Sequence, residues 1–446
     1  MTDIAVQNGP CLESNRHLRI FTVFLLYAGQ GIPIGLFDFA IPAWMAVNGA
    51  SAQDIGFLVA MTGIPWSFKF FAGFIIDRYT MLSMGRRRAW IIGAQALMML
   101  LLILFAVISP GPRDVLILGL VALAVNTAVV FQDVATDGLT VDIIPEEERS
   151  FAGALSAGGQ VVGIAASAAL TGLMVRAYGA SAAYLACATL VAVVNLHVIW
   201  VRERFCERRL PWSPGGAHRA NVDAQVRSWL PLAKNALRNS LSPLSLILAP
   251  VLIAKGMVYG LCLIAVPLIA TRYVGWTEDR IGSLAGTAQL VAGISTIAIG
   301  SLIAAKFGAQ RALLFSVLGL IALTGWMWTV SSQWTDPMFI TAFIFGWTII
   351  YFWGGVGQVV IIMRMSPPAI AATQYSIFMA LHNMGISLAG IMVGAFAYFA
   401  EPEAMLELLV AVQVIAAAIL LTVKFPTKRI DAPLAPVVRK PALAEV

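Results

Sequence analysis

Charge is scarce in this chain of 446 residues: Asp, Glu, Lys and Arg make up 12% of it. Soluble domains carry about 25%. Hydrophobic residues account for 59%, and the mean hydropathy is +0.84. So few charged side chains cannot cover the water-exposed surface of a protein this long. These proportions exclude a soluble globular protein and predict a membrane protein that crosses the bilayer many times.

The sequence also lacks the patterns of catalytic, metal and nucleotide-binding sites. No two of its four cysteines form a CxxC pair, so neither a disulfide framework nor a zinc site is indicated. Its Gly-rich stretches are not followed by the Lys-Ser/Thr of a phosphate loop. We therefore predict no enzyme, no cofactor and no bound metal. The net charge of +6 does not indicate a nucleic-acid partner, because no basic stretch carries an aromatic stacking platform.

Long apolar runs are abundant, and twelve of them reach the roughly 20 residues that a membrane-spanning helix needs. Because the runs are continuous rather than alternating, they favour helices over a barrel. The first run is too long for a cleaved signal peptide, so we expect it to be retained. The prediction is an all-α membrane protein with spans at about 19–46, 54–77, 89–109, 114–143, 150–176, 180–201, 243–271, 279–305, 309–331, 337–366, 369–399 and 404–423.

A polar, arginine-rich segment at 202–242 divides the spans into two sets of six. We predict an N-terminal six-helix bundle at 19–201, a linker at 202–242 and a C-terminal six-helix bundle at 243–424. Tails at 1–18 and 425–446 flank them.

The distribution of Lys and Arg predicts the orientation. With both termini in the cytoplasm, 23 of the 29 basic residues lie on the cytoplasmic side, as the positive-inside rule requires. Only Lys69 and Lys255 fall within spans. The four basic residues on the outer side are Arg113, Arg176, Arg272 and Arg280.

The two halves share a loop signature. Asp-Ile-Gly at 54–56 opens the second span and Arg-Ile-Gly at 280–282 opens the eighth, and both spans end in a basic loop. The first of these loops contains Gly73, Asp77-Arg78 and then Gly-Arg-Arg-Arg at 85–88. This pattern resembles the major facilitator superfamily. The resemblance implies a twelve-helix secondary transporter for a small molecule, working by alternating access, with a gating loop formed by Asp77, Arg78, Arg86, Arg87 and Arg88.

Two segments are similar to one branch of that superfamily, the peptide, acetyl-CoA and drug uptake branch. They are GIPWSFKFF at 63–71 and FQDVATDG at 131–138. The branch includes AmpG-type muropeptide permeases, acetyl-CoA transporters and some single-component siderophore importers. The resemblance implies import of an anionic solute, most simply a muropeptide-like compound. A siderophore importer of the same branch is the alternative, favoured slightly by the twelve spans. A transporter-like membrane scaffold or assembly factor is the alternative from another class.

Ionisable residues inside the N-terminal spans predict a proton site. Lys69 and Asp133 lie at comparable depth, and Asp133 and Asp137 lie four apart on one helix face. Gln132 is adjacent and is expected to donate to a carboxylate. Two close acids cannot both ionise cheaply, which suits proton coupling. A static salt bridge within the bundle is the alternative interpretation.

The C-terminal half places Lys255 near the membrane midplane, with His382 and Asn383 at similar depth. We expect Lys255 to contact an anionic substrate. Pairing with Asp38 or with an acid of the fourth span is the alternative. Gln30 and Asp38 lie eight apart in the first span, on roughly one face, and are predicted to line the same path.

Together these features predict a monomeric, proton-coupled importer of the bacterial inner membrane. Its expected partners are a small, anionic solute and the lipid bilayer.

Overall fold

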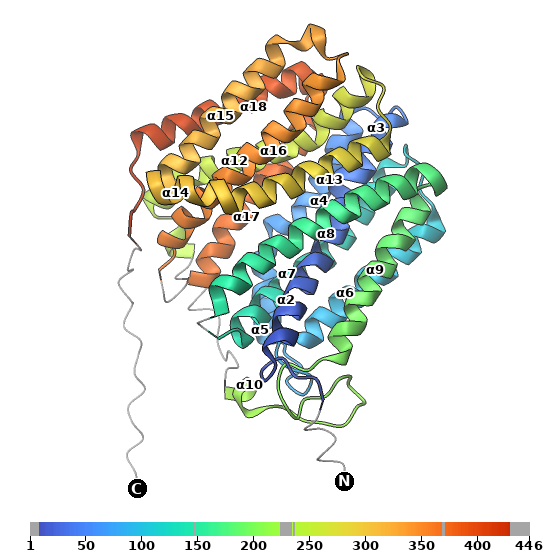
Figure 1. Ribbon diagram of the computed structural model, residues 1–446, viewed down its shortest axis with the longest axis vertical. Coiled ribbons are helices and arrows are strands. Elements are labelled where there is room, and N and C mark those ends of the chain that lie inside the picture. The colour runs from blue at the N-terminus through green and yellow to red at the C-terminus, as the bar shows by residue number, and fades with distance from the viewer. Residues whose placement is uncertain (1–8, 146–147, 224–233, 235–236, 368–370, 429–446) are drawn as a thin grey trace.

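The computed structural model describes residues 9–145, 148–223, 234, 237–367 and 371–428, and it is built of helices (Figure 1). The helices of the N-terminal half are α2 (Arg16–Ile34), η1 (Gly35–Ala40), α3 (Ile41–Val47), α4 (Ala52–Ser67), α5 (Lys69–Arg78), α6 (Arg88–Ile108), α7 (Val115–Ile143), α8 (Arg149–Tyr178) and α9 (Ala180–Trp200). Those of the C-terminal half are α12 (Pro243–Arg272), α13 (Glu278–Ser295), η3 (Thr296–Gly300), α14 (Ser301–Phe307), α15 (Ala309–Thr329), α16 (Pro337–Arg364), α17 (Ala371–Ala395) and α18 (Pro402–Thr422).

The long helices lie side by side, and the short helix α10 (Arg219–Asp223) lies below one end of them (Figure 1). We call this the linker end, and the opposite one the far end. Within the described residues, eleven helices are long and apolar enough to cross a membrane, and the bent pair α4–α5 makes twelve. The predicted all-α membrane fold is confirmed.

The second span is broken, which the continuous apolar run at 54–77 did not predict. Helices α4 and α5 meet at an angle of 40°. Pro65 lacks the N–H that would bond to the carbonyl of Met61, and Phe68 leaves the helical region with φ −115° and ψ 15°. The break makes Lys69 the first residue of α5.

The first span contains a wide, π-helical turn. It runs as one span over Arg16–Val47, and η1 interrupts its α-helical pattern. Turns of this kind are rare in proteins, and those that occur often lie at functional sites. Here the π turn carries Asp38, whose side chain is half-buried.

The two halves of the chain pack closely toward the far end, where α4 lies along α17 and α8 along α13. Glycine permits the first contact, because a Cβ on Gly390 would overlap the carbonyl oxygen of Gly56. On the other side, Arg176 at the end of α8 donates to Asp279 at the start of α13 over 2.7 Å. The far end is therefore closed between the halves.

The start of the predicted linker folds against the N-terminal half. Leu12 N–H donates to the Arg202 carbonyl over 2.9 Å, and Arg202 N–H donates to the Pro10 carbonyl over 3.0 Å. The boundaries of the two bundles, the linker and the tails stay a prediction.

Candidate functional site

A cavity of about 370 Å³ lies between the two halves. All five residues predicted to bind substrate line it, and so do Lys69 and Asp133 of the predicted proton site. Aromatic and amide side chains form much of the remaining wall, among them Trp66, Asn126, Gln160, Tyr259, Tyr351 and Gln358. The cavity therefore combines several charges with a largely uncharged, polar and aromatic surface, as ligand sites commonly do.

Lys255 is the cation of the C-terminal wall. It is 5% exposed, and its ammonium group donates to the Tyr351 carbonyl over 2.9 Å and lies 4.2 Å from the centre of the Tyr351 ring. No carboxylate of the described residues lies within 4.0 Å of it. The alternative pairing with Asp38 or a fourth-span acid is thus not made in this conformation. Among the described residues, the Tyr351 carbonyl and the face of its ring are the groups that stabilise the charge.

His382 and Asn383 make different contacts. His382 Nε2 shares a hydrogen bond of 3.0 Å with the hydroxyl of Tyr351, and its buried Nδ1 has no partner in the described structure. Asn383 donates from its side chain to the carbonyl of Trp66 over 3.3 Å, which links α17 to α4 of the other half. His382 is thus linked through Tyr351 to the surroundings of Lys255, whereas Asn383 joins the two walls of the cavity.

Lys69 and Asp133 form a buried ion pair in the N-terminal wall. The ammonium of Lys69 lies 2.9 Å from Asp133 Oδ2, and Gln30 donates to Asp133 Oδ1 over 2.6 Å. Asp133 is 4% exposed and Lys69 is 9% exposed. Both oxygens of the carboxylate are occupied, so the pair is well satisfied despite its burial.

The other two members of the predicted proton site donate to or accept from other partners. Asp137 accepts a hydrogen bond of 2.5 Å from the hydroxyl of Tyr27 and is exposed. Gln132 does not donate to a carboxylate as expected. It points to the neighbouring helix and donates to the Leu26 carbonyl over 3.1 Å, because positions 132 and 133 face different directions on α7.

Several aromatic residues of the site were not predicted. Tyr27 lies one turn before Gln30 on α2, and Tyr259 lies one turn after Lys255 on α12, where it donates to Asp38 over 3.2 Å. These spacings of three and four residues place them on the faces already identified. The spacing is the signal that sequence reasoning missed.

A family model described as the Major Facilitator Superfamily matches residues 20–431. The chain belongs to the Major Facilitator Superfamily. It is a multi-pass membrane transporter, and the prediction that it is not an enzyme is confirmed.

This transporter is also similar to individual proteins. It is 27% identical to the anhydromuropeptide permease of Escherichia coli K12 over 397 residues, covering 86% of this chain and 76% of the permease. It is 22% identical to an uncharacterized protein of Haemophilus influenzae, covering 83% and 87% of the two chains. The crystal structure of the nucleoside transporter NupG superimposes with a TM-score of 0.64 at 15% identity, covering 91% of this chain and 99% of that one. The last similarity concerns the fold alone.

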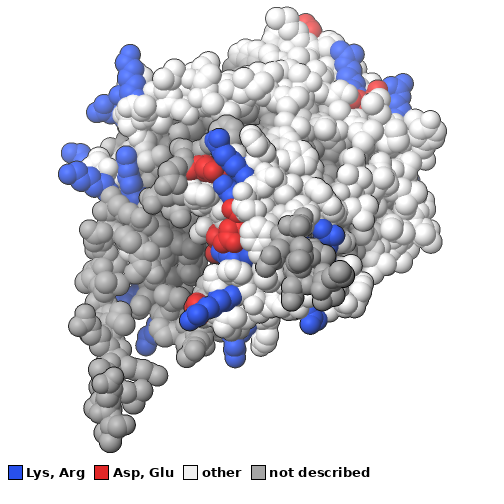
Figure 2. All heavy atoms as spheres, turned by 60° about the horizontal axis from the view of Figure 1, so that its bottom comes forward, with Lys and Arg blue, Asp and Glu red and all other residues white. Residues whose placement is uncertain are grey.

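The predicted gating loop lies at the linker end, where Figure 2 shows acidic and basic side chains together. Asp77 contacts Arg87 over 2.6 Å and Arg86 over 3.6 Å. Both arginines also contact Asp142 at the end of α7, which the prediction did not include. The loop acid thus joins α5 to α7 within the N-terminal half.

The remaining two predicted loop residues point elsewhere. Arg78 is exposed and lies 6.0 Å from the ring of Tyr79. Arg88 is fully buried beneath the linker, and its guanidinium donates to backbone carbonyls, those of Met84, Val198, Arg208 and Arg209. Arg88 therefore anchors the linker to the N-terminal half.

Glu203, in the predicted linker, binds the backbone of the predicted gating loop, which the sequence did not indicate. Its fully buried carboxylate accepts the backbone N–H groups of Arg86, Arg87 and Arg88 over 2.9, 2.8 and 2.6 Å. Glu207, in the same linker, is also buried. This burial is the main cause that raises the pKa of Glu207 to about 7, and the nearby charge of Glu203 is the second cause. Partial protonation of Glu207 near neutral pH limits the repulsion between the two acids.

Replacing Glu203 by Gln is expected to lower the free energy of unfolding by about 2–3 kcal/mol, because hydrogen bonds to a charged group contribute about 1.5–3 kcal/mol each and an amide keeps only part of them. Thermal unfolding of the purified protein in detergent measures the effect. Glu13→Gln is the matched control, since the side chain of Glu13 is 46% exposed and its contact with Arg204 is 3.3 Å long. Equal stability of the two variants would contradict the anchoring role of Glu203.

Proposed function

We propose that this transporter imports an anionic, muropeptide-like solute together with protons across a bacterial inner membrane. The observation that carries the proposal is Lys255, a buried cation that lines the central cavity without a carboxylate among its described neighbours. A cation in such a place stabilises the protein poorly and attracts an anion strongly. His382, Gln30 and Asn383 supply hydrogen-bonding groups around the same solute.

The similarity to the anhydromuropeptide permease supports the solute class, since it extends over most of both chains. Peptide-bearing sugars carry carboxylates, amides and hydroxyls. The cavity offers an ammonium group for the first, and amide and phenol groups for the others.

Proton coupling is assigned to Asp133 and Asp137. Protonation of Asp133 would release Lys69, and protonation of Asp137 would remove the charge that Tyr27 stabilises. Either event changes contacts between α7 and the first two spans. The loop residues Asp77, Arg86 and Arg87 then open and close the linker end, which faces the cytoplasm with both termini. The transporter works as a monomer.

Uptake into liposomes containing the purified full-length protein tests the proposal. Labelled anhydromuropeptide is expected to accumulate when the outside is acidic, and accumulation is expected to stop when a protonophore collapses the pH difference. A ferric siderophore is the comparison solute. Uptake of the siderophore alone would replace the proposed solute by the alternative importer, and transport of neither would favour a scaffold.

A further inference from the structure

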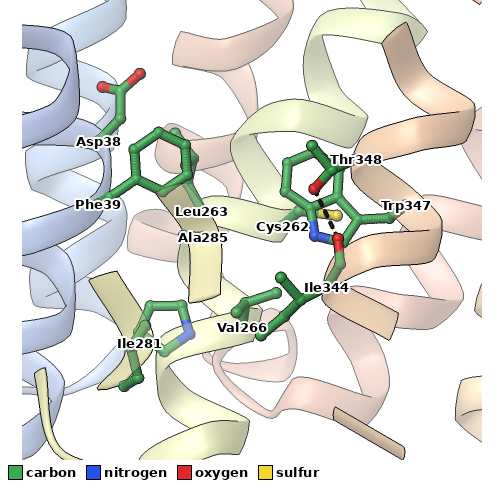
Figure 3. A pocket seen from close by; sticks show the side chains of 11 residues that line it. Asp38, Phe39, Cys262, Leu263, Val266, Ile281, Ala285, Ile344, Trp347 and Thr348 are labelled. Carbon is green, nitrogen blue, oxygen red and sulfur yellow. Dashed lines mark hydrogen bonds between the residues drawn. The ribbon is translucent and has the colours of Figure 1, made fainter. Parts of the chain in front are cut away.

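The two ends of the molecule differ in the surface that they offer to a partner. At the far end the halves close over a cavity of only about 20 Å³, between Asp38 and Phe39 of the first span and Trp347 and Thr348 of α16 (Figure 3). That volume holds about one water molecule, so the cavity has no room for a ligand in this conformation. The linker end instead exposes residues 208–216 of the predicted linker, which have no part in the proposed transport. We call them the Trp212 loop.

The Trp212 loop lies at the membrane end of two peripheral helices, α6 and α9, and Figure 1 shows the chain between α9 and α10 below them. Arg88, the first residue of the α6 span, donates to the carbonyl oxygens of Arg208 over 3.0 Å and of Arg209 over 2.5 Å. Neither helix contributes a residue to the central cavity. Both carry exposed apolar side chains, among them Val107 and Leu196, which contact lipid in a membrane. The loop therefore lies at the edge of the bilayer, beside lipid.

Hydrogen bonds hold this loop in one shape. The hydroxyl of Ser213 accepts the backbone N–H groups of Arg209 and Leu210 over 2.9 and 3.0 Å. The guanidinium of Arg208 donates to two carbonyl oxygens of the same loop, each over 2.9 Å. Because its polar backbone groups are bonded within the protein, the loop presents a fixed set of side chains to its surroundings.

Trp212 is the large apolar side chain of that set, and it is 81% exposed. It lies between Pro211 and Pro214, which are exposed as well. An indole held in water is costly, whereas the headgroup region of a bilayer accepts it, because the ring is apolar and its N–H finds a polar partner there. Trp200, the last residue of α9, is also exposed. Two exposed tryptophans thus lie at the same end of this helix.

The arginines of the loop lack acidic partners. Among the described residues, neither Arg208 nor Arg209 has a carboxylate within 4.0 Å, and Arg209 Nε has no hydrogen-bond acceptor. The acids of the same segment, Glu203 and Glu207, are fully buried, so they cannot contact a ligand at this surface. A planar guanidinium fits two oxygens of a phosphate group. The charge of the loop is therefore complementary to a phosphate.

We propose that the Trp212 loop is a binding surface for anionic phospholipids. Trp212 enters the headgroup region of the adjacent leaflet, and Arg208 and Arg209 contact the lipid phosphates. The position beside lipid-facing helices favours a lipid surface over a protein partner. This role goes beyond the proposed function and depends neither on the solute nor on proton coupling.

Fluorescence of the purified full-length protein in a neutral detergent tests the proposal. Phosphatidylglycerol or phosphatidylcholine with brominated acyl chains is added stepwise, and the difference in emission between the wild type and Trp212→Phe reports Trp212 alone. Half-maximal quenching is expected at a much lower concentration of phosphatidylglycerol than of phosphatidylcholine, by about fivefold for each of the two arginines.

Arg209→Gln is expected to reduce this preference for phosphatidylglycerol about fivefold. We choose Arg209 because the described bonds within the loop use the guanidinium of Arg208 instead, so the loop keeps its shape. Arg219→Gln, an exposed position on α10 outside the loop, is the matched control and is expected to keep the full preference.

Four results would overturn the proposal. Emission of Trp212 that neither lipid quenches places the indole in water, and equal half-maximal concentrations make it an anchor without headgroup recognition. An unchanged preference in Arg209→Gln removes the arginine contact. Relief of the quenching by excess inorganic phosphate makes the loop a site for a free anion. None of these measurements involves the solute, so their failure is distinct from a failure of the proposed transport.

Discussion

Replacing Lys255 by Met is expected to lower the initial rate of anhydromuropeptide uptake about 100-fold, because removing one partner of a buried charged contact costs about 2–5 kcal/mol and about 1.4 kcal/mol corresponds to tenfold. The effect is expected in apparent affinity, since Lys255 is proposed to bind the solute directly. Uptake rates over a range of solute concentrations measure it.

The thermal stability of Lys255→Met shows whether its loss of uptake comes from lost binding or from misfolding. Lys255 is buried beside a carbonyl and an aromatic ring, so its removal is expected to leave thermal unfolding unchanged or to raise its temperature. Lys255→Arg keeps the charge and is expected to retain part of the uptake. Lys306→Met, at an exposed position of α14, is the matched control. Normal uptake by Lys255→Met would refute the assignment of the anion site.

Replacing Asp133 by Asn is expected to destabilise the transporter by about 3–5 kcal/mol, because it leaves the ammonium of Lys69 buried without its counter-charge. Thermal unfolding in detergent measures this change. Asp137→Asn is expected to have a much smaller effect on stability, since Asp137 is exposed and its partner is a neutral phenol.

A double variant distinguishes the two interpretations of this pair. Replacing Lys69 by Met and Asp133 by Leu removes both charges at similar volume and is expected to recover most of the lost stability. If the pair also couples protons to transport, the double variant stays uncoupled although it is stable. Recovery of proton-driven uptake in the stable double variant would mean that the pair is a static salt bridge.

Hydropathy and charge counting predicted the fold and much of the cavity wall. Charges are so rare in the spans that depth alone placed Lys69 level with Asp133 and Lys255 near the midplane, and the structure shows all three lining one cavity. Asp38 and His382 follow from the same argument. The residues found this way share one property, which is that burying them in lipid is costly.

Hydropathy and charge counting could not predict which side chains of different helices contact each other. Depth placed Asp133 and Asp137 near Lys69, but it could not show that Asp133 pairs with the lysine and that Asp137 accepts from Tyr27. Aromatic residues such as Tyr259 and Tyr351 are common in spans for reasons of packing, so composition does not mark them as cavity residues. Glu203 lies in a polar segment that is typical of a solvated loop, yet it is fully buried. Each of these depends on tertiary contacts.

The break in the second span gives α5 two attached ends. Lys69, its first residue, holds Asp133 inside the membrane, and Asp77, its ninth, holds Arg87 in the loop outside, about 12 Å along the helix. Because α5 begins directly after the break at Phe68, it can tilt about that residue as a short rigid helix. Any tilt that separates Lys69 from Asp133 also displaces Asp77 relative to Arg87. On the proposed coupling, a proton that breaks the Lys69–Asp133 pair inside the membrane would therefore also move the Asp77–Arg87 contact at the aqueous surface.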